Sequence, residues 1–158
     1  MKKLITLAAF SLAAIATPAM ATDFTGPRVE VTAGADDVTG VRDTTDVTYG
    51  AAVGFDFRVA GPVIAGVEAN LDNVFDRRDV GASARLGVEA TENLLVYGRV
   101  GYANYKDVFG RELDGLRVGG GVELAVTKNV FAKAEYRYTD FDKGVGKHGA
   151  LVGVGLRF

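Results

Sequence analysis

Residues 148–158 read HGALVGVGLRF, and this stretch decides the class of fold. Every second residue is apolar, namely Ala150, Val152, Val154, Leu156 and Phe158. The residues between them are mostly small, namely Gly149, Leu151, Gly153, Gly155 and Arg157. A period of two over this length is typical of a β-strand whose two faces meet different surroundings. A bare apolar face needs a partner strand and an apolar solvent, and a barrel closed within a membrane supplies both.

The same alternation recurs along the chain. It predicts eight strands, at 28–35, 47–59, 63–72, 79–90, 94–105, 114–126, 130–139 and 148–158. Short turns at 60–62, 91–93 and 127–129 alternate with longer polar loops at 36–46, 73–78, 106–113 and 140–147. In each short hairpin the apolar residues share a face only if the turn has an odd number of residues, most simply three. The pattern indicates an all-β fold, an eight-stranded antiparallel up-and-down transmembrane β-barrel.

Residues 1–21 are predicted to be a cleaved signal peptide. Lys2 and Lys3 precede a short apolar stretch from Leu4 to Ala16, and residues 18–21 (PAMA) end in a small-x-small cleavage pattern. An N-terminal membrane anchor is the alternative, but the apolar stretch is short for a spanning helix. We therefore expect export, with residues 22–158 forming a single barrel domain.

Composition excludes several classes of function. The chain has no cysteine, which rules out disulfides, thiolate nucleophiles and cysteine metal sites. The chain has 18 Lys and Arg residues, of which Lys2 and Lys3 lie in the predicted signal peptide. The remaining 16 bases and the 20 Asp and Glu residues give a net charge of −4. This balance gives no reason to expect a nucleic-acid partner. His148 is the single histidine, and we expect neither a metal site nor a cofactor.

Two kinds of barrel fit the alternation. In a soluble barrel such as a lipocalin the apolar face points inward, whereas in an outer-membrane barrel it faces lipid. Glycines share the charged face, which suits a cramped interior filled by side chains. Aromatic residues form two girdles, with Tyr49, Tyr102 and Tyr138 near the long loops and Phe57 and Phe158 near the short turns. Several strands also reach the roughly 9–11 residues that a tilted crossing needs, so the membrane barrel is favoured.

The inward face of this barrel carries seven acids and seven bases. They are Glu30, Asp56, Arg58, Glu68, Asp72, Arg85, Glu89, Arg99, Arg117, Glu123, Lys133, Glu135, Arg137 and Arg157. Such groups could form an active site or a proton relay. We interpret them as an ion network that neutralises itself and plugs the lumen, because an unpaired buried charge costs several kcal/mol.

Turn length also predicts which inward residues face each other. The third short turn sets Glu123 opposite Lys133, as an expected ion pair. The second short turn sets Arg85 opposite Arg99, two like charges that Glu68 is positioned to bridge. The predicted lumen is therefore crossed by a connected network.

Acidic residues also gather in the predicted loops, namely Asp36, Asp37, Asp43, Asp76, Asp107, Asp140 and Asp142. They could bind calcium, but acidic loops are usually only solvated, and solvation is our interpretation here.

Five features follow one another in an order that is typical of one family. They are the predicted signal peptide, the eight strands, the alternating turns and loops, the EYRY sequence at 135–138 and the final Phe158. In this order the chain resembles the porin-family, or opacity-type, small outer-membrane β-barrels, which are similar to the transmembrane domain of outer membrane protein A. The resemblance covers residues 22–158 and implies a bacterial outer-membrane location, with outer-membrane lipid and lipopolysaccharide as neighbours. It further implies assembly by the barrel insertion machinery, which reads a C-terminal aromatic signal, here Phe158. We expect a monomer.

These observations favour an integral outer-membrane protein with a structural or surface role. Two alternatives remain, a narrow ion pore and an adhesin or binding module that uses the loops at 36–46 and 106–113. An enzyme is not expected, because small outer-membrane enzymes need a nucleophile or an acid–base set positioned at the outer rim.

Overall fold

The structure, a computed structural model, describes residues 23–39, 44–73, 78–106, 112–141 and 145–158. The predicted signal peptide lies outside the described residues. Within these ranges there is no helix of the length and hydropathy that crossing a membrane requires.

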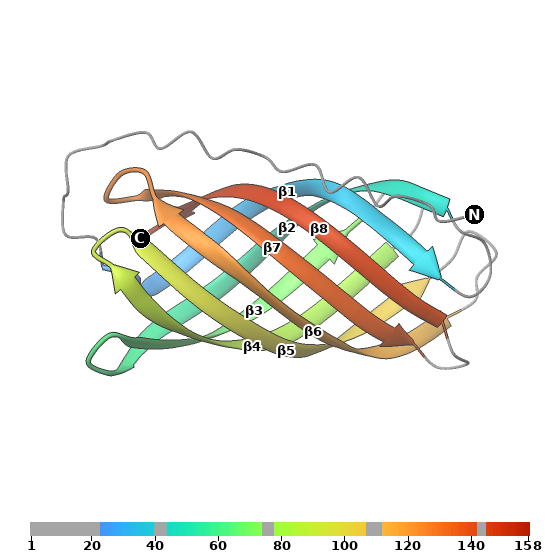
Figure 1. Cartoon of the computed structure of the whole chain (residues 1–158), viewed down its shortest axis with the longest axis horizontal. Coiled ribbons are helices and arrows are strands. Elements are labelled where there is room, and N and C mark those ends of the chain that lie inside the picture. The colour runs from blue at the N-terminus through green and yellow to red at the C-terminus, as the bar shows by residue number, and fades with distance from the viewer. Residues whose placement is uncertain (1–22, 40–43, 74–77, 107–111, 142–144) are drawn as a thin grey trace, which may run out of the picture.

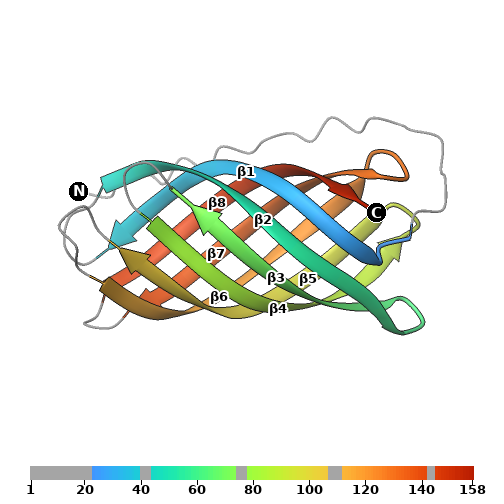
Figure 2. The same cartoon turned by 180° about the vertical axis from the view of Figure 1, so that it is seen from behind.

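Eight strands follow one another along the chain. They are β1 (Gly26–Thr39), β2 (Thr44–Ala60), β3 (Val63–Asp72), β4 (Arg78–Thr91), β5 (Leu94–Lys106), β6 (Glu112–Ala125), β7 (Val130–Phe141) and β8 (Val145–Arg157). Each pairs antiparallel with its neighbours in sequence, and β8 pairs with β1 to close the barrel (Figure 1). Seen from behind, β1 again lies between β2 and β8 (Figure 2). The predicted eight-stranded antiparallel barrel is confirmed.

The strands extend further into the polar segments than the sequence predicted. β1 and β2 pair as far as Val38 and Thr44, so most of the predicted loop at 36–46 belongs to the wall. Ladder hydrogen bonds need only backbone groups, and pairing therefore continues where the apolar alternation has ended.

Two of the three short turns differ from the prediction. Ala60 pairs with Val63, and Thr91 pairs with Leu94, so these turns contain two residues each. In both hairpins the register shifts by one residue beside the turn, as a β-bulge does. A bulge plus a two-residue turn has the parity of a three-residue turn, and the predicted faces are preserved. The third turn keeps its three residues, with the Val126 N–H donating to the Val130 carbonyl at 2.8 Å.

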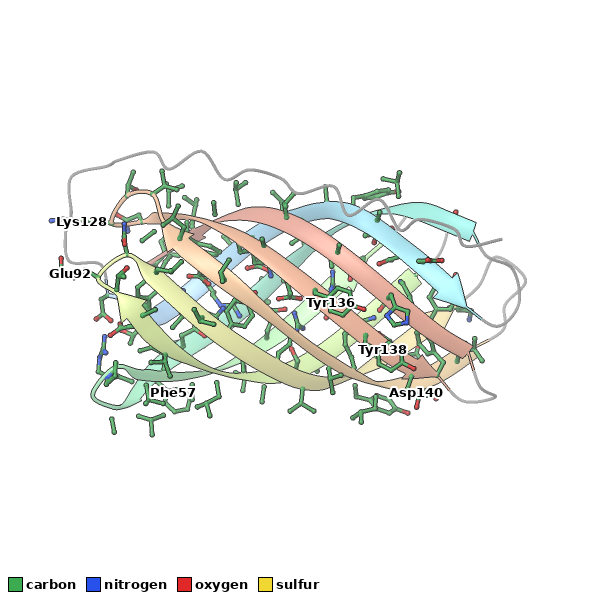
Figure 3. The ribbon with its side chains drawn as sticks, in the orientation of Figure 1. Phe57, Glu92, Lys128, Tyr136, Tyr138 and Asp140 are labelled. Carbon is green, nitrogen blue, oxygen red and sulfur yellow. The ribbon has the colours of Figure 1, made fainter. Side chains whose placement is uncertain are left out.

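The wall separates an apolar outer face from a charged inner face. The large apolar residues of the outward parity are exposed, among them Val31, Val67, Leu86 and Val154, whereas most charged residues of the other parity are buried. Phe57 and Tyr136 are both exposed on the outer face, Phe57 near one end of the barrel and Tyr136 close to its middle (Figure 3). The assignment of the two faces is confirmed.

We call the end with the turns at 61–62, 92–93 and 127–129 the short-turn end, and the opposite end the long-loop end. Near the short-turn end the interior is apolar, with a buried cluster of Phe24, Ile64, Leu95, Tyr97 and Ala125. The remainder of the described interior is predominantly polar.

Candidate functional site

The lumen is lined by charged side chains that are almost completely buried. In the described chain the buried acids number eight, namely Glu30, Asp36, Asp56, Glu68, Asp72, Asp79, Glu123 and Glu135. The buried bases also number eight, namely Arg28, Arg85, Arg99, Arg117, Lys133, Arg137, Lys147 and Arg157. The set is neutral as a whole, as charges removed from water must be.

Glycines on the inward parity make room for these long side chains. A Cβ added at Gly54 would lie 2.8 Å from Nη2 of Arg28. A Cβ added at Gly119 would lie 3.2 Å from Cγ of Arg99 and 3.4 Å from Cγ of Arg137. The glycines that weaken a strand elsewhere are therefore required here by the packing of the lumen.

Asp56 and Glu123 form the centre of the first cluster. Asp56 accepts hydrogen bonds from Nε of Arg28 at 3.0 Å, from Arg85, and from Nη2 of Arg157 at 3.2 Å. Glu123 accepts from Nη1 of Arg85 at 3.0 Å and from Nη2 of Arg157 at 2.6 Å. The two carboxylates thus bind three arginines from three different strands of the wall, β1, β4 and β8.

Glu68 and Glu135 form the second cluster. Nη1 of Arg99 lies 2.7 Å from Oε1 of Glu68 and 2.9 Å from Oε1 of Glu135. Glu68 also accepts from Nη2 of Arg28 at 2.7 Å, which joins this cluster to the first. The Tyr97 hydroxyl donates to Oε2 of Glu135 at 2.7 Å.

Asp79 forms the centre of a third cluster, nearer the long-loop end. Both of its carboxylate oxygens accept from Nη2 of Arg117, at 2.9 and 2.7 Å. Nζ of Lys147 lies 3.2 Å from Asp79 and 2.7 Å from Asp36. The cavity that these groups line measures about 10 Å³, roughly the smallest space that holds one water molecule.

The predicted register across β6 and β7 is confirmed, but the predicted ion pair is wrong. Glu123 faces Lys133 in the ladder. Lys133, however, contacts Glu30, and its Nζ lies 3.5 Å from Glu135. Long side chains reach past the neighbouring strand, and Glu123 of β6 is paired instead with Arg85 of β4 and Arg157 of β8.

The facing of Arg85 and Arg99 is likewise confirmed, and the predicted bridge between them is wrong. Glu68 pairs with Arg99 and Arg28, whereas Asp56 and Glu123 neutralise Arg85. The two facing arginines therefore point to different carboxylates.

The structure buries twelve of the fourteen predicted network residues in the lumen, namely Glu30, Asp56, Glu68, Asp72, Arg85, Arg99, Arg117, Glu123, Lys133, Glu135, Arg137 and Arg157. Arg58 and Glu89 are the exceptions, and their assignment to the buried network is corrected. The Arg58 side chain is 40% exposed at the short-turn end, where it donates to both oxygens of Glu89 at 2.7 and 2.8 Å. Arg58 has the inward parity of β2, but it lies at the mouth of the barrel, where water reaches its side chain.

Sequence reasoning missed four members of the network, namely Arg28, Asp36, Asp79 and Lys147. Arg28 has the same parity as Glu30, and Asp79 has the same parity as Gly81. Extending the alternation to the ends of the strands therefore predicts that both side chains point inward. Asp36 and Lys147 fall in the predicted loops at 36–46 and 140–147, where the apolar alternation has ended.

The outer face carries an aromatic group near the long-loop end. Nδ1 of His148 lies 2.6 Å from the Tyr136 hydroxyl, and its ring lies 4.7 Å from that of Tyr138 (Figure 3). Phe158 is exposed at the short-turn end, and its role as an assembly signal stays a prediction.

The acidic loop residues do not come together as a metal site in the part of the chain that the structure describes, where no group of three or more acids or histidines is arranged to hold a metal ion. Asp43, Asp76, Asp107 and Asp142 lie outside the described residues.

Comparisons with known proteins agree with this architecture. Residues 5–158 match the family model described as outer membrane protein beta-barrel domain. The 31 kDa outer-membrane immunogenic protein of Brucella melitensis is 39% identical over 75 residues, covering 38% of this chain and 31% of that protein. The chain thus matches about a third of the length of this curated relative.

Two solved structures have the same fold. The Neisserial surface protein A has a TM-score of 0.63 at 20% identity, covering 85% of this chain and 98% of that one. Ail, the attachment invasion locus protein of Yersinia pestis, has a TM-score of 0.58 at 18% identity, covering 85% and 99%. The chain belongs to the outer membrane protein beta-barrel domain family and is a protein of the bacterial outer membrane.

Proposed function

We propose that the protein is a structural component of the outer membrane whose lumen is closed to ions by the buried charge network. The observation that carries this proposal is the neutral set of ion pairs that join strands across the lumen. Arg85 of β4 lies 3.0 Å from Glu123 of β6, and Arg137 of β7 lies 3.0 Å from Asp72 of β3. A permeating ion must separate such pairs, and an uncompensated buried charge is costly.

Planar-bilayer recording of the purified barrel tests this function. The parent protein is expected to show no steady single-channel conductance, with folding verified by heat-modifiable electrophoretic mobility. The double variant Arg85→Ala/Glu123→Ala removes a pair inside the lumen and is expected to give openings. The matched variant Arg58→Ala/Glu89→Ala removes a pair at the mouth and is expected to stay silent. Steady conductance of the parent would establish a narrow pore instead.

We also propose that the long-loop end faces the exterior and takes the surface role. Outer-membrane barrels have short periplasmic turns and longer external loops, and the Brucella relative is named as immunogenic. Because the chain has no cysteine, single cysteines report orientation. Asp140→Cys at the long-loop end is expected to react with an impermeant maleimide on intact cells, and Lys128→Cys at the short-turn end is not (Figure 3). The reverse labelling would contradict this orientation.

The proposed role is non-catalytic, because ion pairs occupy the acids and bases of the lumen. The proposed partners are outer-membrane lipid and lipopolysaccharide along the apolar face, with Tyr136, Tyr138 and His148 at the level of the head groups. The barrel insertion machinery is the proposed partner during assembly, and the proposed final state is a monomer.

A further inference from the structure

Residues 23–25 precede the first strand, yet the Phe24 side chain enters the barrel. Phe24 has no exposed surface and packs against Ile64, Leu95 and Ala125 inside the wall. Gly26 follows with φ at +105°, a left-handed conformation that glycine adopts without strain. This residue lets the chain turn from the lumen into strand β1.

The residues around Phe24 belong to the mouth of the lumen. Ile64, Leu95 and Ala125 are the inward residues next to the three short turns. Together with Phe24 they form an apolar layer across the short-turn end. The lumen therefore has two different barriers in series. One is an apolar layer at the short-turn mouth, and the other is the ion network between this layer and the long-loop end.

Arg157 joins the two barriers. Its guanidinium carbon lies 5.3 Å from the ring centroid of Phe24 and 5.2 Å from that of Phe131, within the range of cation–π attraction. Nη2 of the same side chain donates to Glu123 at 2.6 Å. The Phe24 ring thus lies directly against the side of the ion network that faces the short-turn end.

Side chains of the wall fill part of this end. Leu95 and Tyr97 lie over Gly87, and Phe131 lies over Gly155. Phe24 comes from outside the sheet and adds its ring to this layer.

The contacts that fix residues 23–25 are separable from those of the wall. Asp23 lies 3.4 Å from Arg58, and the two side chains are 70% and 40% exposed, so this pair contributes little. The strand ladder begins at Gly26, which pairs with Asp56. Residues 23–25 can leave the lumen without breaking a strand pair.

We propose that Phe24 is a removable plug that seals the short-turn mouth separately from the ion network. With Phe24 in place, water is excluded from the apolar layer. When Phe24 withdraws, water reaches the side of the ion network that faces the short-turn end, while all strand pairs of the barrel stay intact.

A single cysteine at Ala125 tests the plug, because the chain has no other cysteine. The probe is a small cationic methanethiosulfonate reagent, applied to the folded barrel in detergent micelles. In an Ala125→Cys background, Phe24→Ala is expected to raise the modification rate by about tenfold or more, since local opening then governs access. Phe24→Leu partly refills the mouth and is expected to give an intermediate rate.

Phe57→Ala is the matched control, because it removes the same side chain from the outer face of the same end (Figure 3). Its rate is expected to equal that of the parent. Equal rates for Phe24→Ala and the parent would overturn the proposal, because the wall alone would then seal the mouth. An equal rise for Phe57→Ala would also overturn it, by showing general loosening.

Conductance separates this proposal from the structural function. The plug stands if Phe24→Ala exposes the cysteine while the bilayer stays silent, since the network then remains closed. Steady conductance of the unmodified parent contradicts the closed network whatever the cysteine reports.

Discussion

Replacing Glu123 by glutamine removes one buried negative charge while keeping the volume of the side chain. Glu123 has no exposed surface and binds Arg85 at 3.0 Å and Arg157 at 2.6 Å. Removing one partner of a buried ion pair costs about 3–5 kcal/mol. Because both arginines keep Asp56, we expect the lower end of that range, about 3 kcal/mol of unfolding free energy.

Reversible urea unfolding in lipid vesicles, followed by tyrosine fluorescence and electrophoretic mobility, measures this loss. Glu89→Gln is the matched control, because Glu89 pairs with the 40% exposed Arg58. An exposed pair contributes about 0–1 kcal/mol, so the control is expected to lose no more than that.

Two double variants test which bases depend on Glu123. Adding Arg157→Met to Glu123→Gln is expected to recover part of the loss, since it removes a cation that has lost a partner. Adding Lys133→Met is expected to recover nothing, because Lys133 binds Glu30 and Glu135. The reasoning is refuted if Glu123→Gln costs no more than Glu89→Gln, or if Lys133→Met rescues better than Arg157→Met.

Three further predictions concern the faces, the packing and the assembly. Val154→Arg and Val122→Arg on the outer face are each expected to cost about 2–4 kcal/mol in the same unfolding assay, and parental stability of both would show that the faces are misassigned. Gly121→Val is expected to cost about 1–3 kcal/mol by overpacking. A Cβ there would lie 2.5 Å from the Ala134 carbonyl oxygen, whereas Gly120→Val, whose nearest such contact is 3.4 Å, is the milder control. Deleting Phe158 is expected to leave synthesis and export intact and to lower the amount of inserted barrel, and normal surface levels would argue against an assembly signal.

The barrel and the facing of its residues were predictable because strand parity is rigid. Glu123 faces Lys133 and Arg85 faces Arg99, as turn arithmetic predicted. The facing of Arg85 and Arg99 was predicted correctly although the turn has two residues and not three. The bulge before Thr91 restores the parity that a two-residue turn alone would have reversed. A period of two therefore fixes the face of a residue even where the loop is misjudged.

The ion pairs themselves were not predictable from the register. An arginine reaches several carboxylates across a narrow lumen, and the choice depends on how the wall closes. Asp36 and Lys147 were missed because the apolar signal ends before the strand pairing ends. Phe24 stands as a single apolar residue between polar neighbours, without a period that places it on any face.

The buried charges are divided unevenly along the chain. Strands β1 to β4 contribute six carboxylates and two arginines, a net −4, and strands β5 to β8 contribute six bases and two glutamates, a net +4. Opposite charges on the concave sides of the two halves attract as the sheet curls, and this favours closure of β8 onto β1. A half-formed barrel in the bilayer would carry four unbalanced charges, a costly state. The last half of the chain is therefore expected to insert and close in one cooperative step, with no long-lived four-stranded intermediate.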